Sequence, residues 1–249
     1  MTPFVDIDGY LDSDEGLFAP DISAKISSSV TRNNASRAVS CVSRRPPGSS
    51  YKEVITVEVG PEKKAFVIHK NLLVFYSDYF RSAFNGSFKE ATEGKISLPD
   101  ESDDVFEIFN QFIYSRVLAD GEGEKLTWDQ LIKLWLFGDK YLVPVLQNVA
   151  MNSLKTKSDK ENYIPTEKIK LIWENTLPNS PLRKLILDQV VYETDVDHFI
   201  HPGTEELWTR EALVDLARAL FRKEKSTGKH LMPPRGRCHY HVHNKGEHC

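Results

Sequence analysis

The spacing of hydrophobic residues changes along the chain from the period of β-strands to the period of α-helices, and ordered structure is predicted to begin at Tyr51. A β-branched run over residues 54–59 stops at a Gly-Pro pair, and a second apolar run follows over residues 65–68 after a short charged connection. Two such runs around a tight polar turn predict a β-hairpin. A shorter run over residues 95–98, closed by a proline, predicts a third strand.

Helical patterns surround these strands, with hydrophobic side chains recurring every three or four positions. Ser77 is placed to cap one helix start, and residues 127–130 match a capping box. Pro144 and the Ser180-Pro181 pair suit the first turns of two others. Residues 155–160 predict a polar break. The predicted helices cover residues 71–76, 78–84, 103–114, 131–137, 144–154, 167–175, 182–192 and 207–221, and the last carries Leu213, Leu216, Leu220 and Phe221 at helical spacing.

Composition divides the chain into four segments. Residues 1–50 are first acidic and then rich in Ser, Asn and Arg, which predicts a disordered tail; a short docking peptide is the alternative, because apolar residues lie among its acids. Residues 51–157 hold the strands and the first helices, residues 158–230 form a helical extension, and residues 231–249 are rich in Cys and His. The predicted fold class is α+β: a small β-sheet flanked by a cluster of short helices, followed by an all-α C-terminal extension.

Charge and hydropathy exclude several functions. The 249 residues contain 32 Lys and Arg against 36 Asp and Glu, and this mild acidity argues against nucleic acid as the main partner, because phosphates require a basic face. The longest apolar run, residues 131–137, is far shorter than the about 20 residues that span a bilayer, so no membrane is expected. The acidic N-terminus lacks the pattern of a secretory signal. We therefore expect a protein of the cytoplasm, the nucleus or both.

Several motifs follow one another through the middle segment. They are His69-Lys70-Asn71-Leu72-Leu73, Ser77-Asp78-Tyr79-Phe80, the run from Phe84 to Glu90, Ile96-Ser97-Leu98-Pro99-Asp100, the helix end from Phe106 to Ser115, and the run from Phe137 to Leu146. In this order and at this spacing, residues 51–157 resemble the BTB/POZ domain, in the divergent form common in fungal proteins. The region before Tyr51 shows no extra strand and helix of the kind through which some members swap and dimerise.

The resemblance implies a protein–protein interaction module. BTB domains self-associate or dock on other proteins, and many bind cullin-type scaffolds of ubiquitin ligases as substrate adaptors. Phe88-Lys89-Glu90 matches the hydrophobic-x-Glu element that such members present to the cullin, together with the helix near residues 103–114. Phe88 and Glu90 are therefore the predicted partner-binding residues. The alternative for this motif is a surface loop with a packed Phe88.

Catalytic motifs are missing from the sequence. It contains no dinucleotide-binding or phosphate-binding glycine loop and no His-Glu-x-x-His pair. His69, at a strand-to-helix junction, is predicted to be a structural hydrogen-bonding residue, and Ser77 to be a cap and not a nucleophile. We therefore predict no enzyme, no catalytic residue and no small-molecule substrate.

One segment is rich in metal-binding residue types: residues 238–249 contain two cysteines and four histidines within twelve positions. Cys238, His241, His243 and Cys249 offer two sulfurs and two imidazoles, a set suited to a tetrahedral structural zinc. The pattern resembles a C-x-Y-H-x-H-x(n)-C ending of fungal BTB proteins, and its spacing is not that of a DNA-reading finger. The alternative is a solvated tail with incidental Cys and His. Three cysteines in all predict no disulfide scaffold and a reducing compartment.

Three functions remain open on these grounds. The first is an interaction adaptor, with a cullin scaffold or a second copy of the chain as partner. The alternative is a BTB-containing transcription or chromatin factor with a zinc-binding tail, to which Arg235 and Arg237 add a little positive charge. The third is an enzyme of an unrecognised class, which depends only on the metal site; four protein ligands would close that site, as in structural zinc.

Overall fold

The computed structural model describes residues 46–119, 126–193 and 204–225, with residues 232, 235–236 and 238–243 near the C-terminus. All of them fall within one compact unit of the chain. The zinc ligand Cys249 and residues 1–45 of the predicted disordered tail (1–50) lie outside the described residues. The last three residues of that tail are ordered, because residues 48–50 belong to a short 3-10 helix in which Ser50 is buried.

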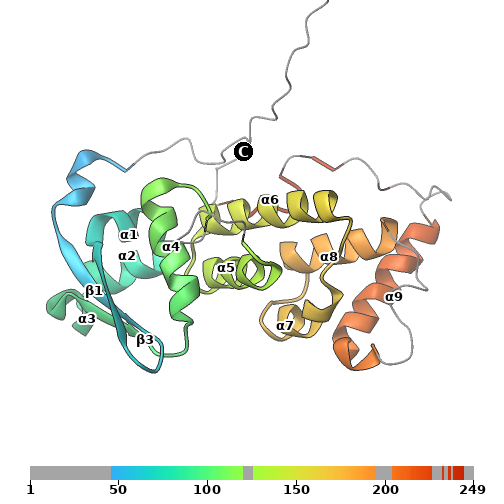
Figure 1. Cartoon of the computed structure of the whole chain (residues 1–249), viewed down its shortest axis with the longest axis horizontal. Helices are drawn as coiled ribbons and strands as arrows, with labels where there is room; N and C mark the ends of the chain where they lie inside the picture. The colour runs from blue at the N-terminus through green and yellow to red at the C-terminus, as the bar shows by residue number, and fades with distance from the viewer. Residues whose placement is uncertain are drawn as a thin grey trace, which may run out of the picture. The chain divides into compact units, whose positions relative to one another are not determined.

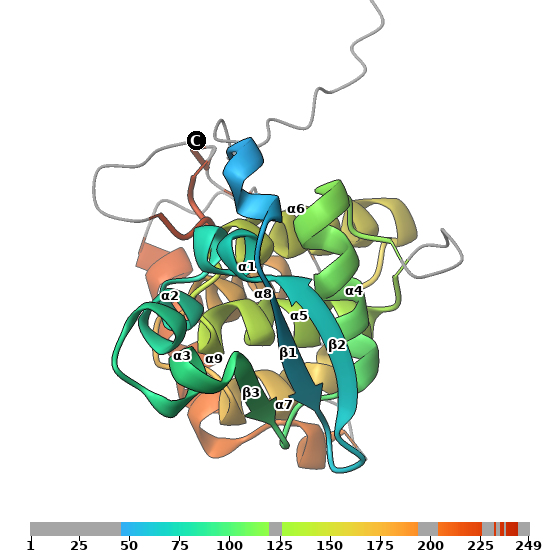
Figure 2. The same cartoon turned by 90° about the vertical axis from the view of Figure 1, so that its left-hand side faces the viewer.

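A three-stranded mixed sheet forms one end of this unit, in the order β2-β1-β3 (Figures 1 and 2). β1 (Val54–Val59) pairs antiparallel with β2 (Lys64–His69), which confirms the hairpin. Gly60 takes the left-handed conformation at the start of its turn, with φ of 74°. β3 (Lys95–Leu98) is the predicted third strand, and it pairs parallel with β1. Alternate residues of the strands are buried, because neighbouring side chains point to opposite faces of a sheet.

Helices lie behind, above and beside the sheet in the view of Figure 2, in which the outer face of the sheet points toward the viewer. They are η1 (Gly48–Tyr51), α1 (Lys70–Tyr76), α2 (Asp78–Asn85), α3 (Lys89–Glu93), α4 (Asp103–Ser115) and α5 (Trp128–Lys140). Aromatic rings fill the core between them. The centroid of the Phe137 ring lies 4.9 Å from that of Phe109 and 4.5 Å from that of Tyr141. Close-packed rings of this kind bury large apolar areas, so this core fixes the sheet against α4 and α5.

The C-terminal part is all-helical, as predicted. Its elements are α6 (Pro144–Glu161), η2 (Thr166–Lys168), α7 (Ile169–Glu174), α8 (Pro181–Tyr192), η4 (Glu205–Leu207) and α9 (Arg210–Lys225). α5 and α6 lie between the sheet and the last three α-helices (Figure 1). Among the described residues, no helix combines the length and the apolar character that a membrane crossing requires.

The predicted polar break over residues 155–160 is wrong, because α6 continues to Glu161. Its polar side chains find partners within the fold. The buried Ser158 hydroxyl donates to the Tyr163 carbonyl (2.9 Å) and accepts a hydrogen bond from Gln189 of α8 (2.7 Å). Lys157 pairs with Glu161 one turn later (2.8 Å). The boundary placed between residues 157 and 158 thus falls inside a continuous helix.

The last helix begins at Arg210, later than predicted, because Thr209 caps it. The Thr209 hydroxyl accepts a hydrogen bond from the backbone N–H three residues on (3.1 Å). In the predicted hydrophobic row, Leu216 is buried, whereas Leu213 and Phe221 are exposed. The row is therefore shared between the core and the surface.

Arg183 joins the three helices α7, α8 and α9. Its side chain is only 2% exposed. One guanidinium nitrogen lies 2.6 Å from Glu211 and 3.6 Å from Asp215, both on α9. The others donate to the Thr176 hydroxyl (2.8 Å), to the Trp173 carbonyl (2.7 Å) and to the Thr176 carbonyl. The guanidinium therefore satisfies the open carbonyl end of α7 and ties it to α9.

Candidate functional site

Phe88 stands at the start of α3 with its side chain 60% exposed. Its ring lies against Gly86, where an added Cβ would come within 2.9 Å of a ring carbon and 3.0 Å of the Ser82 carbonyl oxygen. The bare glycine backbone thus makes room for the ring beside the end of α2. The exposed Phe88 ring is therefore held in place against the backbone of Gly86.

Glu90 follows in the first turn of α3 and lines a shallow hollow of about 270 Å³ beside β3. Two lysines border the same hollow, and both are neutralised. Lys89 pairs with Glu93 (3.5 Å) and Lys95 pairs with Glu58 (2.7 Å). The Glu90 side chain makes neither an ion pair nor a hydrogen bond within the described part of the chain. A carboxylate that forms no ion pair within the described residues therefore lies two residues from the exposed ring.

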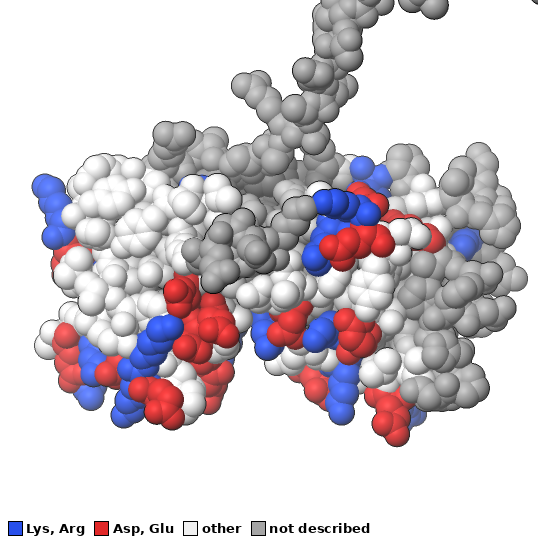
Figure 3. All heavy atoms as spheres, viewed as in Figure 1, with Lys and Arg blue, Asp and Glu red and all other residues white. Residues whose placement is uncertain are grey.

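A second exposed surface, the outer sheet patch, consists of Tyr51, Val54, Val67, His69 and Tyr114. Tyr51 and Tyr114 both pack edge-on against the His69 ring, at 5.5 and 5.8 Å between centroids. His69 donates its backbone N–H to the Tyr114 hydroxyl (3.2 Å), and its Nδ1 lies 2.9 Å from the same oxygen. His69 is thus a structural hydrogen-bonding residue, as predicted. Val54 and Val67 are exposed on the outer face of the sheet. Figure 3 shows an uncharged surface over η1 and the end of α4.

Three of the four predicted zinc ligands come together. One ligand atom from each of Cys238, His241 and His243 lies within 4.8 Å of the other two. Cys238 and His241 are the two ends of a turn, in which the His241 backbone N–H donates to the Cys238 carbonyl (3.2 Å). Residues 238–243, which carry the three ligands, form a turn and an irregular segment and not a helix.

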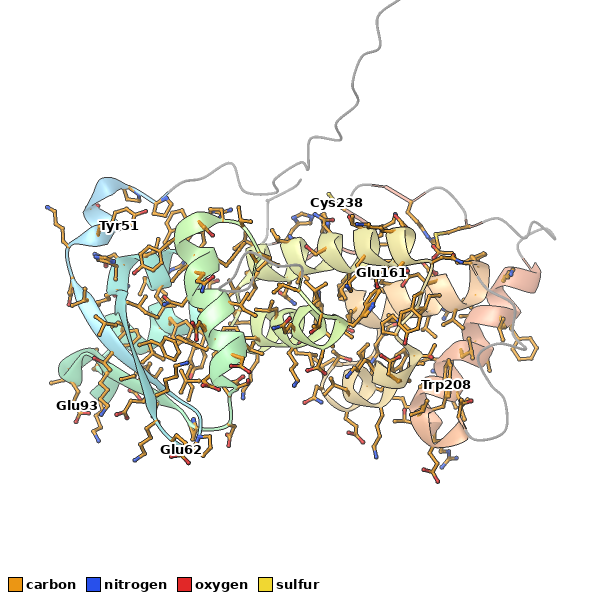
Figure 4. All side chains as sticks on the ribbon, viewed as in Figure 1. Tyr51, Glu62, Glu93, Glu161, Trp208 and Cys238 are labelled. Carbon is orange, nitrogen blue, oxygen red and sulfur yellow. The ribbon has the colours of Figure 1, made fainter. Side chains whose placement is uncertain are left out.

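α6 holds the segment that carries these ligands (Figure 4). The buried Asn148 donates its amide to the Val242 carbonyl (2.8 Å) and accepts from the Val242 N–H (2.7 Å). One turn later on the same face, Asn152 Oδ1 lies 2.8 Å from His241 Nε2. Burial lowers the pKa of His241, and the neighbouring His243 lowers it further, so the neutral imidazole is favoured.

α8 supplies a second anchor through Asp188. Its carboxylate accepts a hydrogen bond from the Tyr240 hydroxyl (2.7 Å) and pairs with Arg235 (2.8 Å). His239 Nε2 lies 3.6 Å from the same carboxylate. His239 therefore contacts α8 and lies outside the metal cluster, and the sequence had not predicted it to be a ligand.

Sequence reasoning missed the residues that hold this segment. Asn148 and Asn152 are spaced four apart and so lie on the same side of α6, and that spacing is a signal that could have been used. Asp188 carried no comparable signal, because its partners lie about fifty positions later in the chain.

Comparison with known proteins agrees with the fold. Residues 51–158 match the model of the BTB/POZ domain. A BTB/POZ domain-containing protein of Arabidopsis thaliana is 26% identical over 188 residues, which cover 72% of this chain and 85% of that protein. A Kelch repeat and BTB domain-containing protein of Mus musculus is 32% identical over 85 residues, 34% of this chain and 15% of the mouse protein. Neither is fungal, so the fungal form stays a prediction. The chain contains a BTB/POZ domain, a protein–protein interaction module, over residues 51–158.

Proposed function

We propose that this chain is an adaptor whose BTB/POZ domain binds a cullin-type scaffold of a ubiquitin ligase through Phe88 and Glu90. The observation that carries the proposal is the exposure of the Phe88 ring, which lies against Gly86, next to the Glu90 carboxylate, which forms no ion pair with the described residues. Interfaces concentrate their energy in a few well-placed anchors of this kind. The partner would supply an apolar pocket for the ring and a basic side chain for the carboxylate. We place this activity in the cytoplasm, the nucleus or both.

The size of the expected effect follows from the burial of the ring. Removing a largely exposed Phe side chain from water is worth about 2 kcal/mol. A charge-assisted contact at Glu90 adds about 1 kcal/mol where it is shielded from water. Loss of both contacts, about 3 kcal/mol, corresponds to roughly a hundredfold weaker binding.

Titration calorimetry of the purified chain with a recombinant cullin N-terminal domain tests the proposal. The variants are Phe88→Ala, Glu90→Ala and the double change. The matched control is Phe221→Ala with Glu174→Ala, since Phe221 is 65% exposed on α9 and Glu174 is exposed at the end of α7. We expect the double variant to lose roughly a hundredfold in affinity and the control less than twofold. Absence of binding by the wild type, or equal losses in both pairs, would contradict the assignment.

Self-association is a second interaction that we propose, supported by the outer sheet patch. Val67 belongs to this patch, is 66% exposed and lies on β2, an edge strand of the sheet. Light scattering during size exclusion, comparing the wild type with Val67→Glu, measures the mass directly. A monomeric wild type across the micromolar range would rule this interaction out.

The transcription-factor alternative receives less support from the described residues. Arg235, one of the two basic residues that favoured it, is occupied by Asp188. A mobility shift with duplex DNA at two salt concentrations tests it, because binding through phosphates weakens steeply as salt rises. A complex that resists salt, or none at all, leaves the adaptor as the proposal.

A further inference from the structure

We propose that Cys238, His241 and His243 bind a zinc ion, and that this ion fastens the C-terminal segment onto α6 and α8. One thiolate and two imidazoles are donors that favour zinc over magnesium or calcium, which prefer oxygen. Three protein ligands leave the fourth position of the tetrahedron to a water molecule or a further ligand. The proposal is independent of the adaptor function.

The distances in the cluster are close to those that zinc requires. Bonds of 2.0–2.3 Å to nitrogen and sulfur put neighbouring ligand atoms about 3.5 Å apart around a tetrahedral ion. In the structure, the three ligand atoms lie within 4.8 Å of one another. Closure of the site therefore needs movements of roughly 1 Å, which side-chain torsions supply without a change in the backbone.

Contacts outside the ligand set position the ligands. Val242 lies between the two histidines, and Asn148 holds its backbone on both sides. With Asn152 Oδ1 as acceptor, His241 carries its proton on Nε2 and its lone pair on Nδ1. An oxygen that accepts the second ring N–H is the usual support of a metal-bound histidine. The arrangement is therefore that of a metal site and not of a solvated tail.

The neighbouring histidine gives an internal contrast. His239 belongs to the same segment, but it lies beside Asp188 and outside the cluster. A cluster formed by chance from a His-rich segment would give no reason for this separation. The structure thus assigns two histidines to the ion and one to α8, and this difference can be tested by substitution.

The expected consequence of zinc binding is a firmer attachment of the segment. Without the ion, hydrogen bonds from Asn148, Asn152 and Asp188 hold it. With the ion, release of the segment also requires loss of the metal, so the exchange of the Val242 amide should become slower. The helices beneath should be little affected, because their cores do not include the ligands.

Metal analysis of the full-length chain, purified under reducing conditions and dialysed against zinc, tests the proposal. We expect one zinc per chain in the wild type and in His239→Ala, and at least tenfold weaker binding in Cys238→Ser and in His243→Ala. Cobalt substitution should give a tetrahedral spectrum with a thiolate charge-transfer band, which Cys238→Ser abolishes. Asn152→Ala, which keeps all ligands, should weaken binding by roughly tenfold. Far-UV circular dichroism confirms that each variant is folded.

The outcomes separate the parts of the proposal. A wild type without zinc, or ligand variants that bind it as tightly as His239→Ala, would overturn the site. Equal hydrogen exchange of the Val242 amide with and without zinc would overturn the fastening role.

Discussion

Replacement of Arg183 by alanine should be among the most damaging single changes in the helical extension. The guanidinium is 2% exposed and contacts two carboxylates, one hydroxyl and two backbone carbonyls. Its plane also lies over the Trp173 ring, 5.3 Å from the centroid. Alanine keeps none of these contacts and leaves a cavity beneath the three helices.

The magnitude follows from what the change leaves behind. Loss of one partner of a buried ion pair costs about 3–5 kcal/mol. Here the remaining carboxylates can regain water, because Glu211 is 49% exposed and Asp215 is 20% exposed. The carbonyls of Trp173 and Thr176 are less able to do so, and each orphaned group costs about 1 kcal/mol or more. We therefore expect the free energy of unfolding to fall by about 3 kcal/mol, with a melting temperature lower by roughly 6–12 °C.

Urea unfolding followed by circular dichroism and by tryptophan fluorescence measures this loss, since agreement of the two probes supports a two-state analysis. Arg183→Lys keeps the charge but not the planar fork, so it should fall between the wild type and alanine. Arg218→Ala is the control, because that arginine is 67% exposed and lies 3.6 Å from the same Asp215. If Arg183→Ala costs no more than the control, the buried guanidinium does not stabilise the extension.

Three further changes test other contacts. Ser77→Ala removes the cap of α2 and a hydrogen bond to the Tyr141 carbonyl (2.6 Å), so unfolding in urea should show a loss of about 2 kcal/mol; a loss under 0.5 kcal/mol would contradict this. Gly86→Ala should displace the Phe88 ring and weaken cullin binding in the calorimetric assay, with some loss of stability from the contact with the Ser82 carbonyl; unchanged affinity would show that the position of the ring is unimportant. Asn148→Asp cannot donate to the Val242 carbonyl, so protease cleavage after α9 should accelerate; equal cleavage rates would refute the anchor.

Local signals explain why much of the fold could be predicted. The Ser77 hydroxyl accepts from the Phe80 N–H (3.0 Å), and Thr127 and Gln130 form the predicted capping box. These contacts depend on residues three apart, so the sequence displays them directly. The hairpin is equally local. By contrast, the parallel pairing of β3 with β1 depends on the path of the chain through three helices, and no short pattern encodes it.

The failures have two causes: a missing local pattern, and contacts between residues distant in sequence. α3 was missed because none of its five residues is buried, so it has no hydrophobic period to detect. The polar end of α6 was taken for a break because its partner Gln189 lies thirty-one positions beyond Ser158. The zinc ligand set could be listed from residue types alone, but the contacts that distinguish His239 from His241 required the fold.

α6 joins the BTB/POZ domain to the helical extension and also holds the C-terminal segment. The BTB/POZ match ends at residue 158, three residues before the end of α6, so the domain and the extension are joined by one continuous helix. The same helix presents Ser158 to α8 and the two asparagines to the C-terminal segment. Neither Phe88 nor Glu90 lies on it. Loss of zinc should therefore loosen the C-terminal segment while leaving the α3 surface intact, because sites without shared contacts contribute independently. An adaptor built in this way could bind a scaffold through α3 and present another surface through the extension.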